Sequence, residues 1–162
     1  MSFKMRPEVD DWFAKVVQIK GSTAPKWDAY YLCLMMGLAK GRAEEPAHAV
    51  EFVDYFVNDY RPAQNTIIGM LIASEARVHG VDLGNRASIR TLLLDYVSPD
   101  TPVGLTQAGF ERLNWYANGG FNEIVSRYPD TRPWSPADFF QWYLPIIQDV
   151  VNESPTWNSL RP

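Results

Sequence analysis

Residues 26–40 read KWDAYYLCLMMGLAK, and this stretch decides the fold of the chain. Its apolar residues cover nearly the whole circumference of a helix, so a helix formed here must be buried on several sides. The break at Pro25 precedes the stretch and Gly41 closes it. We therefore expect a central core helix, in which the close approach of a second helix would offset the cost of Gly37.

Apolar residues recur at three- and four-residue spacing on both sides of this stretch, which is typical of helices. No long segment alternates between apolar and polar residues as a half-buried strand does. A helix predicted over about 8–19 has Val9, Trp12, Phe13, Val16 and Val17 on its core face. Further helices are predicted over about 46–58, from beyond Pro62 to His79, and from the cap Asn85 to about Val97. The last three predicted helices run from the cap Thr106 to the break at Gly119-Gly120, over the short segment 121–128, and over about 136–151 after the cap Ser135.

The chain has 162 residues, of which 46% are hydrophobic and 21% are charged, with a formal net charge of -4. These values are typical of one globular domain. No flexible linker and no internal repeat divides the chain. The sequence therefore predicts a single all-α domain over residues 1–162, an orthogonal or antiparallel bundle of about seven helices, with 151–162 as an extended tail.

Cys33 is the only cysteine, so the chain has no internal disulfide, and a reducing, cytoplasmic location fits best. No apolar run approaches the roughly 18 residues that a membrane span needs, and the first residues contain no apolar segment of the kind that signals secretion. We expect no membrane partner.

The sequence contains neither of the usual glycine-rich phosphate-binding motifs for nucleotides. Its two histidines are His48, expected at the surface, and His79, four residues after Glu75. That spacing could bind a divalent ion or orient an imidazole, but an exposed polar pair is the favoured interpretation. Cys33 lies among apolar neighbours and is interpreted as a core residue. We expect no enzyme activity, no cofactor, no metal and no small-molecule substrate.

The charges divide the chain into two parts. Residues 1–42 hold all five lysines and carry seven bases against four acids, a net charge of +3, whereas residues 43–162 carry eight bases against fifteen acids, a net charge of -7. The first part is the one most able to meet an anionic partner such as DNA. The candidate phosphate-contacting residues are Lys15, Lys20, Lys26, Lys40 and Arg42, and the alternative is an ordinary solvated face.

Aromatic residues make up 14% of the chain, and several fall where they need not all be buried. Trp and Tyr are enriched in protein interfaces. An aromatic, acidic C-terminal half is most simply a protein-docking surface, and the equally weighted alternative is that these rings fill the core. The candidate interface residues are Trp134, Phe139, Phe140, Trp142, Tyr143 and Trp157.

The layout of residues 6–10, 21–25 and 30–39 resembles that of the small DndE-type proteins of bacterial DNA phosphorothioation systems. The shared pattern is a short amphipathic helix, a turn with Gly, Thr and Pro, and an apolar second helix, and it covers about the first 42 residues. The chain departs from the family in length, in its aromatic C-terminal two thirds and in lacking a strongly basic surface. The resemblance implies an accessory DNA-linked subunit of a prokaryotic DNA-modification or phage-defence complex, with Lys15, Lys20, Lys26 and Lys40 as the matching bases.

These observations lead to one expectation and one alternative. The expectation is a non-enzymatic accessory or adaptor subunit of a larger prokaryotic complex that acts on DNA, with other protein subunits as partners and DNA as a further one. The alternative is a stand-alone small DNA-binding or regulatory protein that uses its lysine-bearing N-terminal helices.

Overall fold

The computed structural model describes residues 1–17 and 25–153, and within them it is mostly helical. The part described contains six α-helices rather than about seven, one 3-10 helix and a small two-stranded sheet that the sequence analysis did not predict. In chain order the elements are β1 (Phe3–Met5), α1 (Pro7–Phe13), α2 (Pro25–Lys40), β2 (Val50–Val53), the 3-10 helix (Arg61–Ala63), α3 (Gln64–Val78), α4 (Arg86–Tyr96), α5 (Gln107–Arg127) and α6 (Pro136–Glu153).

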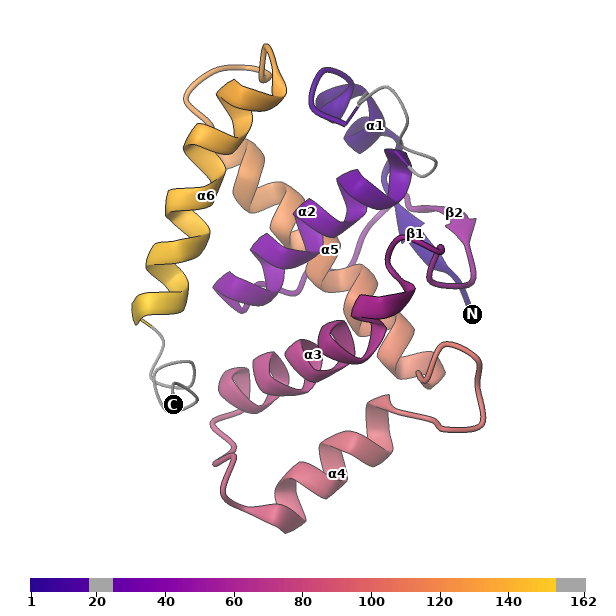
Figure 1. Ribbon diagram of the computed structural model, residues 1–162. Coiled ribbons are helices and arrows are strands. Elements are labelled where there is room, and N and C mark those ends of the chain that lie inside the picture. Colours follow the sequence, from indigo (N-terminus) through magenta and orange to yellow (C-terminus); the bar gives the residue numbers. More distant parts are fainter. Residues whose placement is uncertain (18–24, 154–162) are drawn as a thin grey trace.

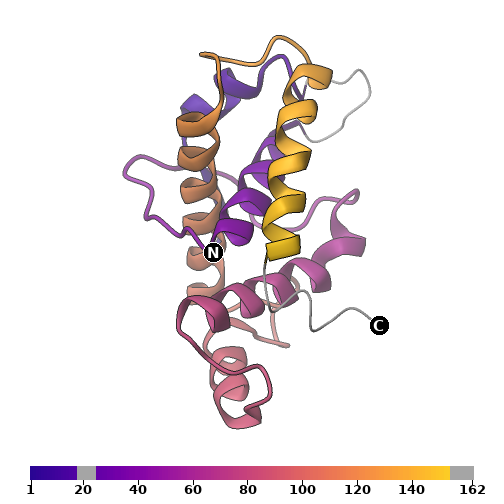
Figure 2. The ribbon, with the colours of Figure 1, turned by 90° about the vertical axis from the view of Figure 1, so that its left-hand side faces the viewer.

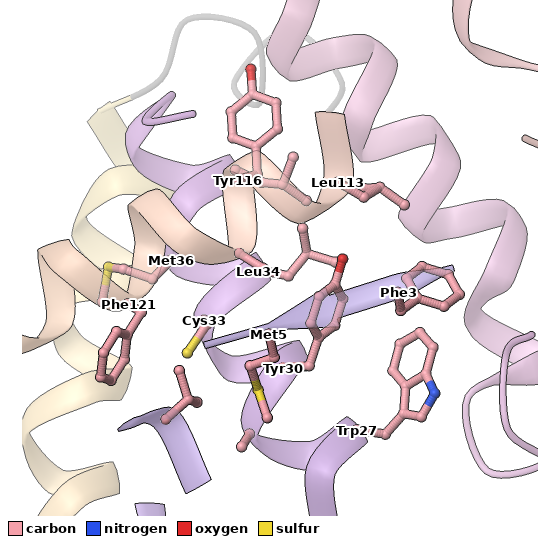
Figure 3. Packing of buried hydrophobic residues seen from close by; sticks show 14 of the residues in the cluster. Phe3, Met5, Trp27, Tyr30, Cys33, Leu34, Met36, Leu113, Tyr116 and Phe121 are labelled. Carbon is pink, nitrogen blue, oxygen red and sulfur yellow. The ribbon is translucent and has the colours of Figure 1, made fainter. Parts of the chain in front are cut away.

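The helix α2 is the central element, as its sequence predicts. It contacts α1, α3, α5 and α6, and it crosses α5 in the middle of the molecule (Figure 1). Side chains from β1, α2 and α5 meet there in one hydrophobic core, and Trp27, Tyr30 and Leu34 of α2 are buried in it (Figure 3). Cys33 is buried too, which confirms its interpretation as a core residue.

Glycines allow α2 and α5 to approach closely. A Cβ atom at Gly37 would overlap the carbonyl oxygen of Tyr116, and a Cβ atom at Gly120 would overlap that of Cys33. The predicted break at Gly119-Gly120 is therefore wrong, because α5 continues through both glycines without interruption. Gly120 is a contact point with α2, Gly119 lies against the backbone carbonyl of Arg42 just beyond α2, and neither glycine is a helix stop.

Replacing Gly120 by alanine should destabilise the protein by at least about 3 kcal/mol, because backbone atoms of α2 would have to move to admit the methyl group. The matched control is Gly69→Ala in α3, where a Cβ atom would meet nothing within 4 Å. Alanine at position 69 should stabilise the helix by about 0.5–1 kcal/mol. Urea unfolding measures both free energies, and equal effects of the two substitutions would contradict the close-approach role of Gly120.

The helix predicted over about 46–58 is wrong. In its place, β2 pairs antiparallel with β1, with Lys4 opposite Glu51 and Met5 opposite Val50. The sequence of β2 is rich in β-branched and aromatic residues, which fit a pleated, half-buried surface. Pairing with the N-terminal residues then satisfies backbone groups that a helix would have satisfied internally.

Several predicted helix starts are confirmed by their hydrogen bonds. The side chain of Asn85 accepts from the backbone N–H of Ser88, that of Thr106 accepts from Gly109, and that of Ser135 accepts from Asp138. Gly80 ends the turn after α3 with a φ of 63°.

The helix predicted over about 8–19 is shorter in the structure, because α1 ends at Phe13. A following turn still brings Val16 and Val17 into the core beside Val9, Trp12 and Phe13, so the predicted core face is confirmed. The last residues of that prediction, 18 and 19, lie outside the described residues. The extended tail predicted from residue 151 is wrong over 151–153, which belong to α6, and its remainder lies outside the described residues. None of the helices that the structure describes is long and apolar enough to cross a membrane.

Candidate functional site

Most of the aromatic residues predicted for an interface lie on or near the inner side of α6. Phe139 and Tyr143 are buried, and their rings contact each other at a centroid distance of 5.0 Å. The prediction of Phe139 as an interface residue is corrected, because its ring is buried against Phe13 of α1. Tyr143 is also buried and donates to a carbonyl of α2, but its side chain borders the groove described below. Phe140 and Trp142 are half-buried, Trp134 is 70% exposed, and Trp157 lies outside the described residues.

The bases predicted to contact DNA are mostly engaged with other groups of the chain. The ammonium of Lys26 lies 3.3 Å from a carboxylate oxygen of Asp10, and the guanidinium of Arg42 binds both Glu44 and Glu123. The ammonium of Lys15 lies 4.5 Å from the centre of the exposed Trp134 ring. The acids beside Lys26 and Arg42 reduce the positive charge that these two residues offer to phosphates, whereas the neutral Trp134 ring leaves the charge of Lys15 in place.

The two remaining bases predicted to contact DNA are Lys40 and Lys20. Lys40 lies at the C-terminal end of α2, where a positive charge complements the helix dipole. Lys20 lies outside the described residues.

An apolar groove of about 350 Å³ lies where α2, α3 and α6 meet. Figure 2 shows α6 in front of α2, with α3 crossing below them. All the described residues that line the groove are uncharged. They are Tyr31, Leu32, Met35, Leu38 and Ala39 from α2, Met70 and Ser74 from α3, and Phe140, Tyr143, Leu144 and Ile147 from α6.

The hydroxyl groups of Ser74 and Tyr143 at the groove donate to backbone carbonyls of α2. The hydroxyl of Ser74 donates to the carbonyl of Leu38 at 3.1 Å, and the hydroxyl of Tyr143 donates to that of Leu32 at 2.8 Å. Burial also raises the pKa of Tyr143 well above its ordinary value, so its hydroxyl stays protonated as a donor. The groove therefore presents mainly apolar surface.

Leu144 is the most exposed apolar residue of the groove, with 56% of its surface accessible. Together with the half-buried Met35, Met70, Phe140 and Ile147 it forms a continuous apolar surface over three helices. Contiguous exposed apolar surface of this kind typically marks a site of interaction with another molecule.

Sequence reasoning found only part of this groove. It named Phe140 and Tyr143, whereas Tyr31, Met35, Met70, Leu144 and Ile147 were not named as site residues. The available indications were the apolar circumference of α2 and the aromatic residues of α6. Nothing in the sequence shows that α3 passes beside both α2 and α6, so Met70 and Met35 could not be placed together.

The pair Glu75 and His79 is not the exposed pair that the sequence analysis favoured, because Glu75 is completely buried. Its carboxylate accepts hydrogen bonds from the guanidinium of Arg112 at 2.8 Å and from the hydroxyls of Tyr116 at 2.7 Å and Tyr96 at 2.8 Å. His79 remains half-exposed, with Nε2 3.4 Å from the carboxylate. This network ties α3 to α4 and α5, which is a structural role.

Burial by itself would raise the pKa of Glu75, but the hydrogen bonds from Arg112, Tyr116 and Tyr96 outweigh it and hold the pKa below its ordinary value. The same contact acts in the opposite direction on Tyr96, where burial and the neighbouring carboxylate raise the pKa to about 12. Glu75 is therefore ionised and both tyrosines are protonated donors at neutral pH.

Glu75→Gln should destabilise the protein by about 3 kcal/mol at pH 7, because Arg112 would lose its buried counter-charge. A carboxyl whose pKa is lowered by folding stabilises the native state above its ordinary pKa of about 4.3 and loses that contribution as the pH falls through the lowered pKa. The difference between wild type and variant should therefore shrink below about pH 4.

Urea unfolding at several pH values measures this difference. The control is Glu111→Gln, since Glu111 is exposed and accepts only from the neighbouring Gln107 in the described contacts. A difference between wild type and Glu75→Gln that stays constant from pH 7 to pH 3 would contradict the ionic role of Glu75.

The other candidates for chemistry are the Cys33 thiol, His48 and groups of metal-ligating side chains. Burial raises the pKa of the Cys33 thiol far above its ordinary value, so the thiolate that would react is disfavoured. His48 is exposed, as expected. Among residues 1–17 and 25–153, no group of three or more His, Cys, Asp or Glu side chains is placed to hold a metal ion.

Comparisons of this chain with protein-family models, with curated proteins and with solved structures find no match.

Proposed function

We propose that this protein is a non-enzymatic accessory subunit that docks on a partner protein through the groove between α2, α3 and α6. The observation that carries the proposal is the exposed apolar surface around Leu144, which is held in place by three packed helices. Binding sites on rigid elements need little reordering when a partner arrives, so more of the contact energy remains for affinity.

The partner complex is one that acts on DNA in a prokaryotic cell, in modification or phage defence. This part of the proposal is supported by the resemblance of the first 42 residues to DndE-type proteins. In such a complex other subunits would supply most of the contact with DNA, because Lys26 and Arg42 are engaged with acids of this chain.

The substitution Leu144→Glu should abolish the association with the partner. A charge buried in an apolar interface without a counter-charge costs at least about 2 kcal/mol, which is roughly a 30-fold loss of affinity. The matched control is Leu94→Glu on α4, because Leu94 is 68% exposed and lies outside the groove. Both variants should fold with little change in stability, since both side chains face solvent in large part.

The experiment is affinity purification of the tagged chain from its host, with and without nuclease, followed by native mass spectrometry. The proposal expects a partner at fixed stoichiometry that survives nuclease, persists with Leu94→Glu and is lost with Leu144→Glu. A stable monomer with no partner would contradict it.

A nuclease-sensitive association would favour the alternative, a stand-alone DNA-binding protein. In that case duplex affinity must fall steeply with salt, and replacing Lys15, Lys20 and Lys26 together by alanine must abolish it.

A further inference from the structure

We propose that a second site on this protein binds one unpaired nucleotide of a nucleic-acid strand, with the base stacked on Trp134 and the phosphate held by Lys15 and Arg132. The site is a cavity of about 310 Å³ between the end of α1 and the segment that joins α5 to α6. These two segments lie beside each other at one end of the molecule (Figure 2). The inference goes beyond the proposed function, since this cavity shares no lining residue with the groove.

Trp134 is the most exposed large apolar side chain in the part of the chain that the structure describes, at 70%. Its position is nevertheless fixed. Its ring Nε1 donates to a carboxylate oxygen of Asp130 at 3.2 Å, and its backbone N–H donates to Asp138 at 3.0 Å. Asp138 also accepts from the hydroxyl of the buried Tyr128 at 2.6 Å, which joins this segment to the core. A large aromatic ring held in place outside the core is typical of a site that binds another molecule.

The structure places two cations beside this ring. The ammonium of Lys15, from the positively charged N-terminal part of the chain, lies 4.5 Å from the ring centre. Arg132 is exposed and lines the same cavity, and its guanidinium donates to the backbone carbonyl of Asp11 at 3.5 Å. Neither cation is paired with a carboxylate of the described residues. Both charges are therefore available to an anion.

Two carboxylates line the cavity as well, so its formal charges balance. The carboxylate of Asp130 accepts from the backbone N–H of Thr131 at 2.7 Å and from the ring of Trp134, which disperses its charge over these donors. The carboxylate of Asp11 is exposed and repels an anion. Stacking on the ring must therefore supply most of the affinity, and phosphate contacts must supply a smaller, salt-dependent part.

A nucleotide matches the ring and the cations together. Every base has a flat π face that stacks on an aromatic side chain, and its phosphate is an anion for Lys15 and Arg132. An acidic peptide offers the anion without the flat ring. A proline-rich peptide docks in a groove lined by aromatic rings. Here Trp12, the other aromatic residue of the cavity, is buried, with its Nε1 donating to the carbonyl of Thr131 at 3.2 Å.

The site favours a single strand over a duplex or a free nucleotide. The bases of a duplex are stacked on their neighbours, so their faces are closed to Trp134. A free nucleotide is usually held by an enclosed set of polar groups or by a glycine-rich phosphate loop, and the sequence contains neither of the usual loop motifs. The cavity volume is at the lower limit for small-ligand sites and matches one nucleotide unit of a longer strand.

The probe is a single-stranded oligothymidylate of ten nucleotides labelled with fluorescein, whose bases stack weakly on one another. Fluorescence anisotropy gives its affinity for the full-length protein at low and at high salt. The ring is tested with Trp134→Leu and Trp134→Phe. The matched control is Tyr55→Leu, because Tyr55 is also an exposed aromatic residue, at 57%, and lies outside the cavity.

Trp134→Leu should weaken binding at least about 5-fold at both salt concentrations, because the leucine has no π face. Trp134→Phe should restore most of the affinity, since a phenyl ring still stacks. Tyr55→Leu should bind as the wild type does. Because Trp134 and Tyr55 face solvent in large part, these variants should fold normally.

The charges are tested by substitutions with opposite expected effects. At low salt Lys15→Gln should weaken binding about 3-fold and Asp11→Asn should strengthen it about 3-fold, and high salt should remove both differences. The control is Arg90→Gln, which changes the net charge as Lys15→Gln does but lies on the exposed side of α4, away from the cavity. It should change the affinity less than Lys15→Gln does.

The inference is overturned by an affinity for the strand weaker than about 1 mM, or by equal affinities for wild type and Trp134→Leu. A duplex of the same length that binds as tightly as the strand would show that no unpaired base is recognised. Thymidine monophosphate that binds as tightly as the strand would assign the cavity to a free nucleotide. Either of these results would also overturn the inference.

This inference and the proposed function fail separately. If the strand does not bind but the cellular complex still requires Leu144, the nucleotide site is wrong and the accessory-subunit function stands. If the strand binds through Trp134 but no protein partner is found in cells, the nucleotide site stands and the proposed function is wrong.

Discussion

The contact between the backbones of α2 and α5 is the constraint on which the rest of this structure depends. Gly37 and Gly120 let the two helices touch without intervening side chains. Dispersion forces and apolar burial act over this short distance, so the pair forms a rigid centre. The elements β1, α1, α3 and α6 then pack around α2 or α5, and each takes its position from that pair.

The groove is a consequence of how these outer helices are placed. The helix α6 packs on α2 through Phe139 and Tyr143, and α3 is fixed beside α2 by hydrogen bonds from Ser74 and Arg77 to the Leu38 carbonyl. Between these two attachments Leu144 is exposed, and Met35 and Met70 are half-buried, in the part of the chain that the structure describes. They form an apolar surface on a frame that does not need to fold around its partner, and this supports the proposed docking role.

Polar groups within the core support the same frame. Glu75 lies in the protein interior with its charge balanced by Arg112 and by two tyrosine hydroxyls, so it joins α3 to α4 and α5 without leaving a buried charge unpaired. The N-terminal bases follow a comparable pattern at the surface, where Lys26 and Arg42 are matched by acids. The charges of Glu75, Arg112, Lys26 and Arg42 therefore connect parts of this chain, and the exposed apolar groove is the surface to which we assign recognition of the partner protein.

The sequence by itself determined the helical class, the central position of α2, the core face of α1 and the caps at Asn85, Thr106 and Ser135, because these depend on local periodicity and on hydrogen bonds a few residues apart. Only the tertiary structure decided that Gly119 and Gly120 are contact points, that Val50–Val53 form a strand, and that Glu75 is buried. It also brought Met70 to the side of Met35 and Leu144. Each of these depends on a partner distant in the sequence, and contacts over such distances leave no periodic pattern in the chain.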